Sequence, residues 1–407
     1  MVDAEHARAL RERSPYNIAH VECCPDSADP YYRDYQDAAK ALRRWQTEGV
    51  LRRDPAPAYY VYEQRFSVHG EIHTRRCFFA RLRLHPPEDG AVRPHEATMP
   101  GPVEDRLQLL RATVTNVSPI FAMFDDDGGT ARAILDQLAS TRPLFEASDD
   151  RGDRHRLWMV DDAAQLAALT GAVEASVVTI ADGHHRYTTA LDYSREQPSE
   201  AARWVLAGLI ALDDPGLMIL PNHRLVKADR QPHDLLERLS ELYLTEDVTP
   251  PPSAGGGAHD GAAVRELWDR VQANARGAIS FGALGIQSHS LHLLTARSAE
   301  AIDAAMPARL SRASRSLDVS ILTETVLRPL LGIDTAALAA GERVDFTEEI
   351  EVASNQTEGG SFRLAFLVNP VRVEQVTAVA DASELMPQKT TFFYPKLHTG
   401  MVFNPLD

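Results

Sequence analysis

A short apolar strand pattern that runs through a glycine turn into a helix constrains this chain more than any other feature. Residues 176–180 are apolar and β-branched, which predicts a buried strand, and residues 187–193 have the pattern of a helix. Between them lies ADGHHR (181–186), where Gly183 permits a sharp turn. The first amides of such a helix point outward and carry partial positive charge. With two imidazoles and a guanidinium beside them, they predict an anion site suited to phosphate oxygens.

Other interpretations of this turn remain open from the residues alone. The motif also fits an ordinary helix start whose histidines are surface residues. A metal site on His184 and His185 is disfavoured, because successive helical residues point about 100° apart and no HExxH spacing occurs. The Walker pattern GxxxxGK[ST] and a kinase glycine-rich loop are both absent from the sequence, so a nucleotide would have to be held by another architecture.

Charge and composition restrict the partners. The chain has 407 residues, 58 of them acidic and 42 basic, and its net charge of −16 disfavours binding to nucleic acid. The longest apolar run, Trp204–Leu212, is too short to cross a bilayer and predicts a buried strand. Three cysteines, Cys23, Cys24 and Cys77, suggest no disulfide framework, and no signal peptide is visible. We therefore expect a cytoplasmic protein with a small-molecule substrate, no nucleic-acid partner and no membrane partner.

Hydrophobic periodicity and turn residues predict the remaining elements. A hairpin is expected from two strands around the turn at 69–71, and an Asp/Gly-rich solvated turn at 125–129. A loop is expected at Pro250–Gly257. Helices are predicted over 32–48, 103–113, 262–275 and 317–331, and another between the strands at 155–160 and 176–180. Further strands are predicted over 59–66, 77–84, 277–283, 289–294, 362–368 and 374–379, and an apolar run over 118–124 precedes the acidic turn.

These elements predict an α+β, or mixed α/β, protein of more than one lobe. We expect an N-terminal catalytic lobe over 1–250, a smaller α/β lobe over 262–345, and a segment over 346–407 that completes the catalytic lobe. The site is expected in the cleft between the lobes.

Three separated segments carry the residues that phosphoryl transfer needs. They are Pro94–Thr98 with Glu104–Arg106, the ADGHHR turn, and Lys389–Thr391 with Lys396. Together they supply a carboxylate for an acceptor hydroxyl, amide and cationic donors for phosphate oxygens, and acids able to hold magnesium. Each segment also has a plainer interpretation, as a polar turn, a hydroxyl-rich loop or a surface lysine.

The same three motifs, in this order, resemble those of free serine kinases of the ParB/sulfiredoxin-like superfamily, which carry a PHE segment, a DGHHR turn and an SPKTT segment. The whole chain resembles still more closely the bacterial and archaeal family catalogued as domain of unknown function ten-fifteen. The motifs that carry this second resemblance are Ser14–Asn17, Tyr60–Gln64, His95–Thr98, Asp105–Leu107, Ser118–Phe121, Ala181–Tyr187, Leu317–Val319 and Met386–Lys396.

The resemblance implies a ParB/sulfiredoxin-like catalytic lobe and a role for each matching residue. Glu96 would be the general base for the serine hydroxyl, with His184 or His185 as an acid toward the leaving group. Phosphate or nucleotide would contact Asp182, Gly183, His184, His185, Arg186, Lys389, Thr390, Thr391 and Lys396. His95, Arg106 and Tyr187 are assigned to substrate binding, and Asp182 to Mg²⁺.

The sequence departs from these families in two places. Phe392-Phe393 follows the KTT segment, where the serine kinases have basic or polar residues. This chain therefore need not share the phosphate donor of the serine kinases, or the orientation of that donor in the site. The larger family has an upstream strand and a PPYDVI-like turn that this sequence lacks. We expect either a start codon further upstream or a pocket without that wall.

The resulting hypothesis is a phosphotransferase that converts free L-serine, or a similar hydroxy amino acid, to its O-phospho form. The donor would be ATP, ADP or pyrophosphate with Mg²⁺. Two alternatives stay open: a nucleotide-binding regulatory module of ParB-like type, and a metal-dependent hydrolase that uses His95, Glu96, His184 and His185.

Overall fold

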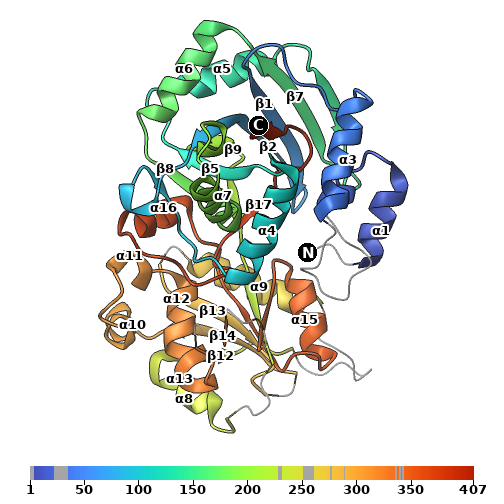
Figure 1. Cartoon of the computed structure of the whole chain (residues 1–407). Helices are drawn as coiled ribbons and strands as arrows, with labels where there is room; N and C mark the ends of the chain where they lie inside the picture. The colour runs from blue at the N-terminus through green and yellow to red at the C-terminus, as the bar shows by residue number, and fades with distance from the viewer. Residues whose placement is uncertain are drawn as a thin grey trace. The chain divides into compact units, whose positions relative to one another are not determined.

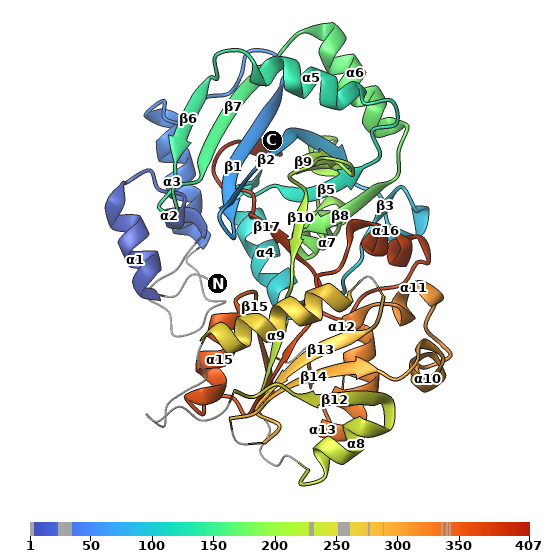
Figure 2. The ribbon, with the colours of Figure 1, turned by 180° about the vertical axis from the view of Figure 1, so that it is seen from behind.

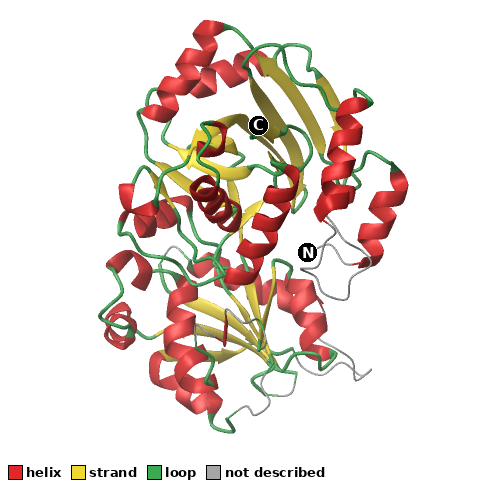
Figure 3. Ribbon diagram, in the orientation of Figure 1, coloured by secondary structure: helices red, strands yellow, loops and turns green. Residues whose placement is uncertain are grey.

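The chain folds into two compact units that share a mixed α+β composition (Figure 3). The structure, a computed structural model, describes residues 4–22, 35–227, 232–250, 261–275, 277–287, 289–334, 337–338, 341 and 343–407. The first unit comprises Met1–Met218 and Pro395–Asp407, and the second comprises Ile219–Tyr394. The C-terminal segment thus returns to the unit in which the chain begins.

The first unit is built on an eight-stranded mixed sheet with the order β3-β8-β5-β9-β2-β1-β7-β6 (Figure 1). Two neighbouring pairs, β3 with β8 and β5 with β9, are parallel, and the other neighbours are antiparallel. The strands, in that order, are Val92–Arg93, Val178–Asp182, Ile120–Phe124, Trp204–Ala211, Glu71–Arg83, Tyr59–Val68, Arg154–Val160 and Phe145–Ser148. A small pair joins β4 (Thr115–Asn116) to β18 (Asn404–Pro405).

Some helices of the first unit share an apolar core with the sheet, and others pack in two smaller apolar clusters. The helices are α1 (Ala4–Arg13), α2 (Ala19–Glu22), α3 (Tyr35–Thr47), α4 (Pro100–Thr113), α5 (Thr130–Ala139), α6 (Ala163–Glu174) and α7 (His184–Glu196), with short 3₁₀ turns η1 (Pro87–Asp89) and η2 (Ala201–Arg203). Leu135 of α5, Leu169 of α6 and Ala190 of α7 pack with Ile120 and Ile180 of the sheet. Burial of this apolar surface holds α7 against the sheet, and with it the turn that begins the helix.

The second unit contains a six-stranded antiparallel sheet with the order β12-β14-β13-β16-β11-β15 (Figure 2). Its strands, in that order, are Tyr243–Asp247, Leu291–Ala296, Ser280–Leu284, Leu364–Leu367, His223–Val226 and Val344–Thr347. A separate pair joins β10 (Met218–Leu220) to β17 (Phe392–Tyr394). The helices are α8 (Leu235–Leu242), α9 (Gly261–Asn274), α10 (Ala299–Ala305), α11 (Arg312–Arg315), α12 (Asp318–Leu322), the π turn η3 (Thr323–Leu327), α13 (Arg328–Leu331), α15 (Ile350–Glu358) and α16 (Val373–Asp381).

Most predicted elements of the first unit form close to their expected positions. The expected hairpin is β1 paired with β2, and its turn residues His69 and Gly70 both have positive φ, as a tight hairpin requires. The acidic run forms a turn, in which the buried carboxylate of Asp126 accepts the backbone N–H groups of Ala131 and Arg132, at the start of α5, at 3.0 and 2.9 Å.

The boundaries between the units differ from those expected. Residues 219–250 and 346–394 belong to the second unit, because β11 and β16 pair with strands of its sheet. Only Pro395–Asp407 returns to the first unit. The predicted strand over 374–379 is wrong: these residues lie in α16, where Val376, Val379 and Ala380 are buried along one face, and the side chain of Gln375 accepts the backbone N–H of Arg372.

Some expectations fall on residues that the structure does not describe. Cys23 and Cys24, the start of the helix predicted over 32–48, and most of the loop predicted at 250–257 lie outside the described residues. Cys77 is buried in β2. Among the described residues, no helix combines the length and the apolar character that a membrane crossing demands.

Candidate functional site

The ADGHHR turn connects β8 to α7 as the sequence predicts. β8 ends at Asp182, Gly183 adopts φ 93° and ψ 28° as the N-cap, and α7 begins at His184. Among the residues that the structure describes, no side chain caps this helix start. Only glycine adopts this backbone conformation without strain, and the guanidinium of Arg186 lies so close that a Cβ at position 183 would be 2.9 Å from one of its nitrogens.

Asp182 lies between two cations. The Nζ of Lys396 donates to its Oδ1 at 2.5 Å, and a terminal nitrogen of Arg186 donates to its Oδ2 at 2.7 Å. The other terminal nitrogen of Arg186 donates to the carbonyl of Pro119. Burial raises the pKa of Asp182, but Lys396 and Arg186 outweigh it and hold that pKa well below its usual range. The two cations exceed the one carboxylate by a full positive charge beside the start of α7.

The two histidines of the turn fix a second segment of the unit. His184 Nε2 accepts the backbone N–H of His95 at 3.2 Å, and His185 Nε2 accepts the backbone N–H of Met99 at 3.0 Å. Residues 95–99 are therefore attached to the turn at both ends. Glu96 lies within this segment and is partly buried. Two motifs, joined by hydrogen bonds between residues 89 and 86 positions apart in the chain, thus meet at one place, as the sequence predicts.

His95 and His184 form a buried, uncharged pair. Their rings meet edge to face with centroids 4.5 Å apart. His95 Nδ1 donates to the carbonyl of Ile180 at 2.7 Å. Burial lowers the pKa of His95 to about 4, although the hydrogen bond to Ile180 acts in the opposite direction. Burial and the neighbouring His95 lower the pKa of His184 well below 6.5. Both imidazoles are therefore neutral at pH 7.

Two residues assigned to substrate binding are held by other parts of the first unit. Arg106, in α4, donates to Glu22 at 2.6 Å and to Asp105 at 3.1 Å. The hydroxyl of Tyr187 donates to the carbonyl of His85 and accepts its N–H, both at 2.9 Å. Burial raises the pKa of Tyr187 to about 12. Both side chains tie elements of the unit together in this arrangement.

Lys389, Thr390 and Thr391 belong to the second unit, whereas Lys396 belongs to the first. Lys389 is exposed and adopts φ 57°, and its carbonyl accepts the side-chain amide of Asn222 at 2.8 Å. Thr390 is buried and its hydroxyl donates to the carbonyl of Pro387. The role of this segment toward phosphate stays a prediction.

Sequence reasoning missed the residues that position Lys396. The side-chain amide of Gln64 donates to the carbonyl of Lys396 at 3.1 Å, and the buried guanidinium of Arg75 donates to the carbonyl of Pro395. Gln64 and Arg75 also bond to each other across β1 and β2. The sequence of β2 gives no signal for Arg75, because the strand contains several other charged residues and only the fold shows which guanidinium is buried and needs acceptors.

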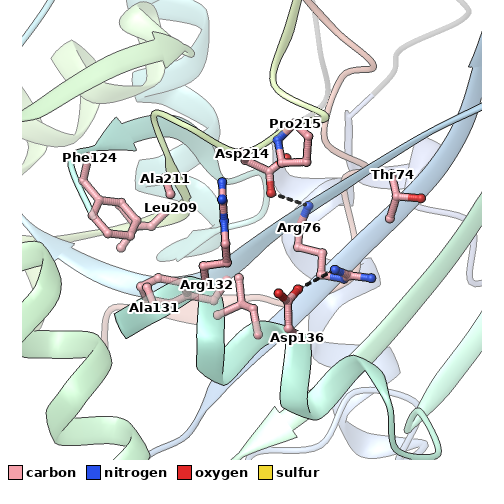
Figure 4. Close-up of a pocket in the computed structure, with 12 residues that line it drawn as sticks. Thr74, Arg76, Phe124, Ala131, Arg132, Asp136, Leu209, Ala211, Asp214 and Pro215 are labelled. Atoms are coloured by element: carbon pink, nitrogen blue, oxygen red, sulfur yellow. Dashed lines mark hydrogen bonds and ion pairs between the residues drawn. The ribbon is translucent and has the colours of Figure 1, made fainter. Parts of the chain in front are cut away.

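A separate pocket of about 220 Å³ lies in the same unit (Figure 4). Arg76, Arg132, Asp136 and Asp214 line it together with apolar side chains, and Arg76 bonds to both Asp136 and Asp214. Burial raises the pKa of Asp214, although the backbone N–H groups of Gly216 and Arg76 act against this. None of the motif residues lines this pocket.

Comparisons with known proteins identify a family. No curated protein matches the sequence. Among solved structures, a conserved hypothetical protein from Pyrococcus furiosus aligns with a TM-score of 0.37 and 13% identity over 81% of this chain and 95% of that chain. A glutamate-to-alanine variant of a free serine kinase in complex with ADP aligns with a TM-score of 0.37 and 12% identity, over 80% of this chain and 92% of that chain. A C-terminally truncated SbnI from Staphylococcus aureus aligns with a TM-score of 0.37 and 11% identity, over 81% of this chain and 87% of that chain.

The sequence itself gives the firmer assignment. Residues 1–320 match the family described as protein of unknown function, DUF1015, as the motifs lead us to expect. Because this match spans well over half of the 407 residues, the chain belongs to the DUF1015 family.

Proposed function

We propose that the chain is a phosphotransferase that moves a phosphoryl group to the hydroxyl of free L-serine or a similar hydroxy amino acid. One observation carries this proposal. The segment that contains Glu96 is attached at both of its ends to His184 and His185 of the glycine turn. The backbone that carries the Glu96 carboxylate, a group suited to accept a hydroxyl proton, is thereby held beside a positively charged helix start that has no side-chain cap among the described residues.

The chemistry follows from this juxtaposition. Glu96 accepts the proton of the substrate hydroxyl as the oxygen attacks the terminal phosphorus of the donor, and the bond from phosphorus to the leaving oxygen breaks. Negative charge on the transferring oxygens lies toward the amide end of α7. Arg186 and Lys396 add positive charge there, which Asp182 only partly offsets. Electrostatic stabilisation of this kind is the main protein contribution to phosphoryl transfer.

His184 and His185 act in this proposal as positioning residues. Their Nε2 atoms accept backbone N–H groups, so these nitrogens carry no proton to give to a leaving group. The depressed pKa of His184 supports the same assignment. Each histidine contributes by fixing the distance between the turn and the segment that carries Glu96.

Magnesium enters this proposal with the donor, as a phosphate-bound part of the substrate. The carboxylate of Asp182 does not offer an open magnesium site, because Lys396 and Arg186 occupy both of its oxygens. In this mechanism Asp182 therefore does not bind a metal ion.

The test is a transfer assay on the full-length chain. Purified protein is incubated with L-serine, Mg²⁺ and either ATP, ADP or pyrophosphate, and O-phosphoserine is followed by mass spectrometry. We expect product with one of the donors. Failure with all three donors and with threonine and homoserine as acceptors would overturn the proposal, provided that the protein is folded.

The same samples separate the alternatives. Calorimetric binding of ATP or ADP with no transfer to any acceptor would favour the nucleotide-binding regulatory module. Release of inorganic phosphate or hydrolysis of an ester that depends on a stoichiometric transition metal, and that is lost in Glu96→Gln, would favour the metal-dependent hydrolase.

A further inference from the structure

A second cluster of histidine and carboxylate side chains lies in the first unit, away from the motifs that the sequence singles out. It consists of Asp149, in the turn between β6 and β7, His155 on β7, and His398 in the C-terminal segment. One ligand atom of each residue lies within 4.8 Å of the other two. We call these three residues the 149–155–398 cluster.

The carboxylate of Asp149 is oriented by its own turn. Its Oδ1 accepts the backbone N–H groups of Arg151 and Asp153 at 2.9 and 3.0 Å. This arrangement is typical of aspartate in tight turns, and it leaves Oδ2 directed at the histidines. Oδ2 lies 3.4 Å from His155 Nε2 and 3.5 Å from His398 Nε2.

These distances are too long for charged hydrogen bonds, which are about 2.7–2.9 Å. They match the spacing of two ligands on one metal ion. Nitrogen and oxygen ligands that are each about 2.0–2.2 Å from a tetrahedral ion lie about 3.3–3.5 Å from one another. The rings of His155 and His398 are close together as well, with centroids 4.1 Å apart.

His155 provides an independent sign that a ligand is expected here. The residue is 4% exposed, and its Nε2 makes no hydrogen bond among the described residues, although Asp149 Oδ2 lies 3.4 Å away. A buried imidazole nitrogen without a partner is costly unless something binds it. The other ring nitrogen, Nδ1, is hydrogen-bonded at 2.9 Å to the hydroxyl of the buried Tyr62. Metal-binding histidines are commonly oriented in this way through the nitrogen that does not bind the metal.

We propose that the 149–155–398 cluster binds one divalent transition-metal ion through two imidazole nitrogens and one carboxylate oxygen. Imidazole ligands select ions such as Zn²⁺ over Mg²⁺ and Ca²⁺, which prefer oxygen ligands alone. The turn over residues 149–153 contains three aspartates and one arginine, so its net formal charge is negative and attracts a cation.

The ion joins the C-terminal segment to the sheet. His398 lies two residues after Lys396, whose ammonium bonds to Asp182. A metal held by His155 and His398 therefore fixes the segment that carries Lys396 against β7. Any effect of the ion on phosphoryl transfer rests on the proposed function. Metal binding does not depend on that function, and it is measured separately.

The test is a titration of the chelator-treated full-length protein with Zn²⁺ by calorimetry, with Co²⁺ absorption as a report on the ligands. We expect one tightly bound Zn²⁺ per chain and weak or no binding of Mg²⁺. Asp149→Asn and His398→Ala should each weaken Zn²⁺ binding at least 100-fold. Tyr62→Phe should weaken it about 10-fold, because the orienting hydroxyl of Tyr62 is lost.

His85→Ala is the matched control. His85 lies 3.5 Å from Asp89, which is the same spacing, but Asp89 and His85 form no three-ligand group among the described residues. Zn²⁺ binding should therefore be unchanged in this variant. Because His398 is 43% exposed, its replacement leaves the core intact, and thermal unfolding without metal checks this. Absence of a stoichiometric Zn²⁺, or equal binding by wild type and His398→Ala, would overturn the proposal. Equal weakening in His85→Ala would do the same.

Discussion

Two groups of histidines in the first unit differ in where their ring nitrogens find partners. In the glycine turn, His184 and His185 each accept a backbone N–H through Nε2, so these rings hold a neighbouring segment in place. In the 149–155–398 cluster, the buried His155 Nε2 has no hydrogen-bond partner among the described residues. The same side chain therefore serves as an internal tether in one place and presents an unsatisfied ligand atom in the other.

The most conspicuous histidines in a sequence are not necessarily the ones whose ring nitrogens are open to a ligand. Adjacent histidines in a motif attract attention, yet here their hydrogen bonds are directed inward. The residues of the 149–155–398 cluster are up to 249 positions apart, from Asp149 to His398, and only the fold brings them together. The two groups of histidines are distinguished by whether each buried ring nitrogen has a hydrogen-bond partner.

The largest expected effect comes from Glu96→Gln, which keeps the size of the side chain and removes its basicity. If the tethered segment serves to present a general base, turnover should fall about 10²–10⁴-fold, since general-base catalysis contributes this much. Donor affinity, measured by calorimetry, should change little.

Glu88→Gln is the control for this change, because Glu88 is an exposed acid in the same part of the unit. It should retain wild-type turnover. If Glu96→Gln also retains turnover, the tethered segment is only structural and the contrast between the two histidine groups loses its functional meaning.

The next effect is a pH dependence of stability that depends on His95. Its pKa is about 4 in the folded protein and about 6.5 when unfolded. Below pH 6.5 the unfolded chain thus binds a proton that the folded chain does not, and stability falls as pH decreases toward 4. The loss from His95 alone amounts to about 3 kcal/mol by pH 4. His184 adds to it in the same direction.

Urea unfolding at pH 7.5, 6 and 5 measures this dependence. His95→Gln should show a shallower fall in the free energy of unfolding than wild type over the same range, whatever its stability at pH 7.5. Parallel curves for the two proteins would show that His95 is not held neutral by burial.

The sequence was sufficient to predict how the turn forms and that residues 95–99 and Lys396 meet it, whereas Lys389–Thr391 belongs to the second unit. β-branched residues before Gly183 and a helical pattern after it gave the strand, the turn and the helix. The hydrogen-bond partners of the site side chains could not be predicted from the sequence, because each partner is distant in the chain. Arg106 bonds to Glu22, and Tyr187 to the backbone of His85, and their roles toward a substrate stay predictions. Val-rich residues 373–379 fit both a strand and a helix, and a cap at Arg372 decides for the helix.

A smaller effect is expected from Gly183→Ala. Position 183 has φ 93°, and a Cβ there would press on the guanidinium of Arg186. We expect a loss of about 1–3 kcal/mol in the free energy of unfolding, from backbone strain and displacement of Arg186. Donor affinity should fall as well.

Gly171→Ala provides the matched comparison. Gly171 lies inside α6, and a Cβ there meets nothing within 4 Å. This change should leave stability equal or raise it by about 0.5–1 kcal/mol, because alanine favours helix over glycine. Similar losses in both variants, measured by thermal and urea unfolding, would contradict a special role for the turn.

The smallest change in stability is expected from Lys396→Met. The ammonium of Lys396 is about half exposed, so its ion pair with Asp182 contributes less than about 1 kcal/mol to folding. Removal of its charge should nevertheless weaken binding of an anionic donor several-fold, and more strongly at low ionic strength. Unchanged donor affinity across a salt series would exclude Lys396 from the anion site.

The most direct measurement is a crystal structure of the full-length chain with ADP and L-serine. We expect the terminal phosphate of ADP at the amide end of α7, beside Gly183 and Arg186. The serine hydroxyl should lie within hydrogen-bond reach of Glu96. A nucleotide bound instead among Arg76 and Arg132 in the pocket of Figure 4, with Glu96 remote from both ligands, would contradict it.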